Sequence, residues 1–159
     1  MKLTSNWKQE IKDYFGISYT DPQDAPGDAL WVTRCSKTKL CQLGKSIPKY
    51  FYVSVQNLRF YASMESYGQH YGILSDKYGI HFDDEELEFY DIHPSELTAA
   101  DKQKLGEIIR KKCLERGWTK LIFWNSSPIM SKPYFEILAA SKLEIYYTTQ
   151  LSDIAARLF

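Results

Sequence analysis

The stretch "LTAADKQKLGEIIRKKCLERG" (97–117), followed closely by "KLIFW" (120–124), decides the fold class of this chain. Thr98 can cap a helix together with Asp101 three residues later, and Gly117 can end that helix. The run 120–124 is almost continuously apolar, which is typical of a buried strand. A helix that leads directly into such a strand indicates an α/β fold.

The same alternation of helices and strands continues on both sides of this stretch. Ser54 can cap a helix in which Val55, Leu58, Tyr61 and Ala62 recur at helical spacing. The pattern predicts one three-layer α/β/α domain with a mainly parallel sheet of about four strands. The predicted strands lie near 29–34, 71–75, 120–124 and 143–149, the helices at 4–15, 55–67, 97–117, 133–141 and 151–158, and two long loops at 36–52 and 76–97, so that the domain spans 1–159 and begins with a helix and connection over 1–28.

Composition disfavours several classes of protein. Lys and Arg number 20 and Asp and Glu number 20, so any anion-binding site must be local, and a generally basic nucleic-acid-coating protein is disfavoured. Three cysteines, Cys35, Cys41 and Cys113, without a CxxC pair indicate a reducing compartment. No apolar run approaches the roughly 20 residues of a membrane span, and charges interrupt residues 1–16, where a signal peptide would be apolar. We therefore expect a cytoplasmic protein that contacts no membrane.

Polar residues follow three of the predicted strands directly, in "RCSKTK" (34–39), "SDKYG" (75–79) and "NSSP" (125–128). Ligands of open parallel sheets bind beyond the carboxyl ends of the strands, and right-handed crossovers bring these three loops to one edge. The cations of the first loop, Arg34, Lys37 and Lys39, therefore suggest a phosphate site. The alternative interpretation of these side chains is that they are simply solvated.

Cys35 allows two interpretations. Neighbouring cations lower the pKa of a thiol, so Cys35 can be an activated nucleophile, with His81 or His93 approaching it in space. A small buried cysteine at a strand end is the alternative, and we favour it. Tyr78 and Gly79 directly follow a strand, which predicts a buried ring and then a turn that needs a positive φ.

Common phosphate-loop and metal motifs are missing from the sequence. A P-loop over "LCQLGKS" would need glycine where Lys39 stands, and Pro48 prevents the helix that such a loop needs. The cysteines and histidines have no recognised zinc spacing, and the acidic run 81–91 lacks the ligand spacing of an EF-hand. We therefore predict no metal and no cofactor.

Four short motifs in order resemble a group of small conserved domains of uncharacterised function. They are "CSKTK" (35–39), "YFYVS" (50–54), "ILSDKYGI" (73–80) and "FYD" (89–91). The later motifs also resemble the bacterial peroxide-stress-resistance family, whose members are linked to DNA binding and protection from oxidative damage. The resemblance implies a shared site made of Cys35, Ser36, Lys39, Tyr52, Ser54, Ser75, Tyr78, Gly79, Tyr90 and Asp91.

A fainter resemblance is to the uracil-DNA glycosylase superfamily. Its last catalytic loop reads His-Pro-Ser-Pro-Leu-Ser, and "NSSPIMS" (125–131) is similar, with Asn125 and Ser126 replacing the first two residues. The resemblance implies a similar α/β frame. The water-activating aspartate of the first loop is missing from "RCSKTK", which speaks against the same hydrolysis. Related domains accompany tRNA-guanine transglycosylase-type enzymes, which implies RNA as a partner.

These observations favour a protein that binds a nucleotide or nucleic acid, in nucleic-acid protection or RNA modification. Phosphates would meet the three cations of 34–39, and a base would lie on the ring of Tyr52, Tyr78 or Tyr90. The first alternative is an enzyme that acts on a nucleobase or nucleotide. In that enzyme Asp91 or Asp76 would be the acid or base, and Ser36 and Ser75 would position the substrate. In either case Asn125 and Ser126 are further candidate ligand-binding residues. The second alternative is a structural subunit whose cleft is vestigial.

Overall fold

The computed structural model of the protein describes residues 3–36, 39, 44–90 and 97–151. Its main sheet has six strands in the order β1-β8-β7-β2-β4-β5, and all neighbouring pairs are parallel except β4 with β5. The predicted α/β class with a mainly parallel sheet is confirmed, whereas the predicted number of strands was too low. The strands of this sheet are β1 (Ser18–Tyr19), β2 (Leu30–Arg34), β4 (Tyr71–Ser75), β5 (Gly79–Phe82), β7 (Lys120–Trp124) and β8 (Glu144–Thr148), and β3 (Lys45–Ser46) pairs with β6 (Leu87–Glu88) in a separate small sheet.

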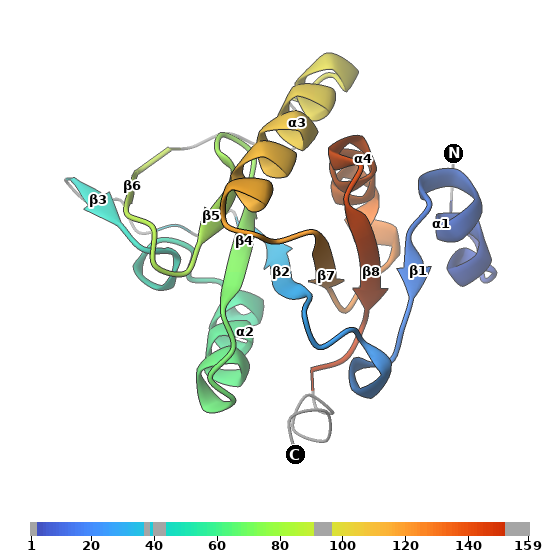
Figure 1. Ribbon diagram of the computed structural model, residues 1–159, viewed down its shortest axis with the longest axis horizontal. Coiled ribbons are helices and arrows are strands. Elements are labelled where there is room, and N and C mark those ends of the chain that lie inside the picture. The colour runs from blue at the N-terminus through green and yellow to red at the C-terminus, as the bar shows by residue number, and fades with distance from the viewer. Residues whose placement is uncertain (1–2, 37–38, 40–43, 91–96, 152–159) are drawn as a thin grey trace.

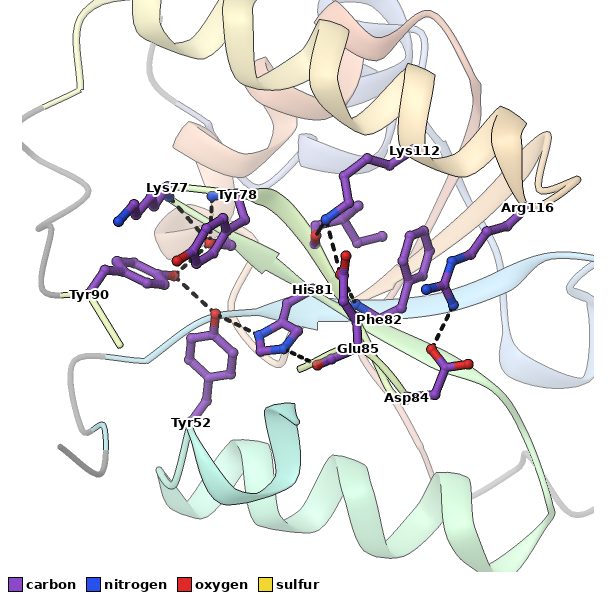
Figure 2. Close-up of polar contacts among 12 residues, drawn as sticks. Tyr52, Lys77, Tyr78, His81, Phe82, Asp84, Glu85, Tyr90, Lys112 and Arg116 are labelled. Carbon is purple, nitrogen blue, oxygen red and sulfur yellow. Dashed lines mark hydrogen bonds and ion pairs between the residues drawn. The ribbon is translucent and has the colours of Figure 1, made fainter. Parts of the chain in front are cut away.

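Strand β5 lies inside a segment that the sequence predicts as a long loop. It forms an antiparallel hairpin with β4, in which Ser75 pairs with Gly79 and Leu74 with Ile80. The polar side chain of His81 interrupts the apolar pattern of this strand, which hides it from a search for apolar runs. Lys112 on α3 (Ala99–Glu115) donates a hydrogen bond to the carbonyl of Ile80 and so ties the edge strand to that helix (Figure 2).

The helices lie close to their predicted positions. The capping box of Thr98 and Asp101 is present at the start of α3, and Gly117 follows its end with a φ of +83°. The predicted helix 151–158 falls almost entirely on 152–159, which lie outside the described residues. Within the described ranges, no helix is both long enough and apolar enough to cross a membrane. The remaining helices are α1 (Trp7–Phe15), α2 (Val55–Ser66) and α4 (Lys132–Ser141), with short 3₁₀ turns η1 (Pro22–Asp24), η2 (Pro48–Tyr50) and η4 (Ile129–Ser131).

Alternate residues of the central strands pack into two different cores. Leu30 and Val32 of β2 belong to the core that α1, α3 and α4 cover, whereas Trp31 belongs to the core that α2 covers. Side chains of a strand alternate between the two faces of its sheet, so the helices cover both faces. Figure 1 shows α3 and α4 together, with α2 set apart from them. This arrangement leaves the carboxyl ends of the parallel strands free to form a site.

The buried face of α2 differs from the one that its sequence suggests. Of the four apolar residues at helical spacing, only Tyr61 is buried, and Val55 and Leu58 are exposed. The helix is instead rotated so that it buries Phe60, Met64 and the polar side chain of Asn57. The full set of buried residues on α2 is Asn57, Phe60, Tyr61 and Met64. Two large apolar side chains at the start of the helix therefore face outward.

Candidate ligand-binding site

The ends of β2, β4 and β7 meet at one edge of the sheet, as the sequence predicts. The backbone N–H of Cys35, just after β2, donates to the carbonyl of Leu74 at 2.9 Å. The hydroxyl of Thr33 donates to the carbonyl of Trp124 at 2.7 Å. These bonds tie the end of β2 to both neighbouring strands.

Two separate cavities open along this edge. We call them the α2 pocket and the α3 pocket, after the helix that forms one wall of each. The α2 pocket has a volume of about 380 Å³ and is lined by Thr33, Arg34, Cys35, Ser36, Ser54, Val55, Gln56, Asn57 and Met130. The α3 pocket has a volume of about 420 Å³ and is lined by Asp76, Lys77, Leu97, Asp101, Lys104, Leu105 and Ile108. The predicted single cleft is therefore divided, with Arg34 on one side and Asp76 on the other.

Cys35 and Asp76 connect the two pockets. The thiol of Cys35, which lines the α2 pocket, donates to Oδ2 of Asp76 at 3.3 Å. Its sulfur also lies 3.6 Å from the hydroxyl of Tyr134 on α4. All three side chains are buried. Asp76 thus reaches the α2 pocket through the thiol of Cys35.

This environment keeps Cys35 in its thiol form. Burial, followed by the negative charge of Asp76, raises the pKa of the Cys35 thiol to about 12. Only the thiolate is an effective nucleophile, so this cysteine is poorly suited to nucleophilic catalysis. The geometry agrees with the interpretation of a buried cysteine at a strand end. His81, which the sequence allowed as its base, has other hydrogen-bond partners, described below.

The start of α2 is fixed to the end of β2 by a buried amide. Asn57 donates from Nδ2 to the carbonyl of Arg34 at 2.9 Å and accepts the Ser54 hydroxyl at 2.7 Å. Ser54 is the N-cap, and its oxygen accepts the backbone N–H of Asn57. The first backbone N–H groups of a helix have no hydrogen-bond partner within that helix. In α2 these include the N–H groups of Val55 and Gln56, and both residues line the α2 pocket.

Asn125 and Ser126 shape the loop that faces α2 across the α2 pocket. Asn125 is buried, and its amide donates to the hydroxyl of Ser131 at 2.8 Å within the same loop. Ser126 accepts a hydrogen bond from the side chain of Gln56 at 3.0 Å. Asn125 therefore holds the loop, whereas Ser126 ties this loop to the first turn of α2.

Three of the other residues implied by the resemblance, Ser75, Tyr90 and Tyr52, form a chain of hydrogen bonds that ends at His81 (Figure 2). Ser75 lies 2.8 Å from the hydroxyl of Tyr90, which lies 3.2 Å from that of Tyr52. The Tyr52 hydroxyl lies 3.3 Å from Nδ1 of His81, whose Nε2 lies 2.6 Å from the carbonyl of Glu85. A carbonyl only accepts, so Nε2 of His81 carries a proton and donates it to Glu85. With His81 neutral, each hydroxyl must then donate toward the histidine, from Ser75 to Tyr90 to Tyr52.

Burial keeps the members of this chain uncharged. It lowers the pKa of His81 to about 4 and raises the pKa values of Tyr52 and Tyr90 above their ordinary range. Tyr52 is 0% exposed and Tyr90 is 5% exposed. The rings of these two tyrosines are therefore part of the core. The prediction that they offer a face to a base is wrong for Tyr52 and Tyr90.

Lys39, Tyr78 and Gly79 lie around the same chain. The backbone of Lys39 pairs with that of Tyr52, and its ammonium lies 5.0 Å from the centre of the Tyr90 ring. Tyr78 is half-buried instead of buried, and its hydroxyl donates to the carbonyl of Glu88 at 3.0 Å. Gly79 has a φ of +76°, which confirms the predicted turn with positive φ. The two remaining predicted residues, Lys37 and Asp91, lie outside the described residues.

Several residues of these sites were not singled out from the sequence as part of a ligand site. Gln56 and Tyr134 carried no motif, Met130 appeared only within the quoted run 125–131, and His81 was considered only as a partner of Cys35. The amide of Asn57 follows a predicted N-cap by three residues, and a polar residue there is the one sequence pattern that could have indicated it. Within the described residues, no group of three or more His, Cys, Asp or Glu side chains is arranged to hold a metal ion. No family model, curated protein or solved structure matches the chain.

Proposed function

We propose that the protein binds a phosphate group of a nucleotide or nucleic acid in the α2 pocket. The observation that carries this proposal is the guanidinium of Arg34. Arg34 lines the cavity, and its guanidinium makes no hydrogen bond and no ion pair with the described residues. A guanidinium presents its donors in a planar fork that matches phosphate oxygens, so an anion is its natural partner.

Other groups of the pocket favour the same ligand. Ser36 also lines the cavity, and a serine hydroxyl is suited to phosphate oxygens, whereas the hydroxyl of Ser54 already donates to Asn57. The first turn of α2 adds two backbone donors and the positive end of the helix dipole. The volume of about 380 Å³ lies within the usual range for small-molecule sites.

Binding without chemistry is the better supported form of this function. An enzyme acting on a nucleobase or nucleotide needs an acid or base in contact with its substrate. Among the described candidates, Asp76 reaches the α2 pocket only through the thiol of Cys35, and that thiol stays protonated at neutral pH. The proposal therefore assigns the pocket to binding and gives no catalytic role to Cys35.

The test is the salt dependence of binding to single-stranded RNA and DNA, measured by fluorescence anisotropy at several salt concentrations. Each phosphate neutralised on a single strand contributes about −0.7 to the slope of log affinity against log salt. Arg34→Gln should make the slope less steep by about 0.7, which corresponds to one lost contact. The charge-matched control is Lys111→Gln, an exposed cation on α3, and it should leave the slope unchanged. Absence of binding, or equal slopes for wild type and Arg34→Gln, would refute the proposal.

A further inference from the structure

Two large apolar side chains lie at the mouth of the α2 pocket. Val55 is 75% exposed and Met130 is 61% exposed, and both line the cavity. They come from different elements, the first turn of α2 and the 3₁₀ turn η4. The hydrogen bond from Gln56 to Ser126, at 3.0 Å, ties α2 to the loop that leads into η4. We call Val55 and Met130 the apolar rim.

A single exposed apolar side chain is ordinary on a protein surface, but these two belong to one cavity. The helical spacing of α2 suggested that Val55 would be buried, and the structure turns it toward the pocket mouth instead. Ile129, the neighbour of Met130 in η4, is also 69% exposed. Methionine has a flexible, polarisable thioether that makes favourable contacts with aromatic rings. The rim therefore suits a flat aromatic group.

The α2 pocket thus combines Arg34, the proposed phosphate-binding residue, and an apolar rim within one cavity of about 380 Å³. A ligand that matches both has a phosphate at one end and an aromatic ring at the other. The buried rings of Tyr52 and Tyr90 leave the rim as the surface available to such a ring. Inorganic phosphate and sugar phosphates would leave the rim uncovered.

We infer that the ligand is a single nucleotide unit whose base packs against Val55 and Met130, an inference that rests on the proposed phosphate site. The base is held through its faces. Gln56, the neighbour of Val55 in the first turn of α2, uses its side-chain amide to donate to Ser126. Contacts to base faces are tolerant of sequence because every base has a π-face. The pocket therefore accepts different bases with similar affinity.

Calorimetric titration with AMP and with ribose 5-phosphate tests this inference. AMP should bind about tenfold more tightly, because only AMP covers the apolar rim. Met130→Ser should reduce the affinity for AMP by about threefold or more and leave that for ribose 5-phosphate unchanged. Leu114→Ser, which changes an apolar residue that is 42% exposed on α3 and does not line the pocket, is the matched control and should change neither affinity.

The outcomes separate this inference from the proposed function. Equal affinities for AMP and ribose 5-phosphate would overturn the inference and leave the phosphate site in place. An equal loss of both affinities in Met130→Ser would overturn it too, because the residue would then act on the pocket as a whole. If neither compound binds, the proposed function fails together with the inference. Titrations with GMP, CMP and UMP should agree with AMP within about tenfold, and strong preference for one base would overturn the tolerance inferred above.

Discussion

Replacing Gly79 with alanine should destabilise the protein more than the same replacement at Gly117. Both glycines have a positive φ, +76° and +83° respectively, which costs any other residue about 1–2 kcal/mol. A Cβ atom at Gly79 would also lie 3.1 Å from Ile108 and 3.2 Å from the carbonyl oxygen of Leu105, both on α3. At Gly117 nothing lies within 4 Å of such an atom. The difference between the two variants therefore measures how tightly the β4–β5 hairpin packs against α3.

The expected loss is about 1–2 kcal/mol for Gly117→Ala and about 1 kcal/mol more for Gly79→Ala, since crowding a packed core typically costs at least that much. The gain from a less flexible unfolded chain is similar at both positions and cancels in the comparison. Urea denaturation followed by circular dichroism gives both free energies of unfolding. For a chain of this size, a loss of 1 kcal/mol corresponds to a Tm about 2–4 °C lower. Equal losses at the two positions, or a smaller loss at Gly79, would refute the reasoning.

Two further predictions follow from the buried groups near the site. At pH 8, a pKa of about 12 leaves about one Cys35 thiol in ten thousand ionised. Alkylation of Cys35 in folded Cys41→Ser protein, followed by mass spectrometry, should therefore be slow. Modification at the rate of a free thiol would contradict this expectation. The pKa of His81 is lowered to about 4, so between pH 6.5 and 4 the unfolded chain binds a proton that the folded chain does not. His81 should therefore lower the free energy of unfolding by on the order of 3 kcal/mol as the pH falls over this range. In urea denaturation at several pH values, His81→Gln should remove this part of the pH dependence. Identical pH profiles for the two proteins would exclude the role of His81.

The main helices and strands could be predicted because their sequences carry local information. A capping box marks the start of α3, an apolar run marks β7, and a serine marks the start of α2. Strands β1, β3 and β6 have two residues each, which is too short for any periodicity. The rotation of α2 was missed because its buried face includes Asn57, whose burial depends on a hydrogen bond to the distant Arg34 carbonyl.

The location of the site could be predicted more easily than its arrangement. Parallel topology alone places the loops after β2, β4 and β7 at one edge. Cys35 and Asp76, whose contact lies between the two pockets, are 41 positions apart in the chain. The buried Tyr52 is likewise hydrogen-bonded to His81, 29 positions away. Such pairings are tertiary, and no spacing in a single sequence reveals them.

A crystal structure of the protein soaked with AMP would show directly whether the α2 pocket binds a nucleotide. We expect a phosphate beside the guanidinium of Arg34 and the backbone N–H groups of Val55 and Gln56, in the α2 pocket. The base should lie against Met130 at the mouth of that pocket. Density for the phosphate in the α3 pocket, beside Lys77 or Lys104, or no bound nucleotide at a saturating concentration, would contradict the account.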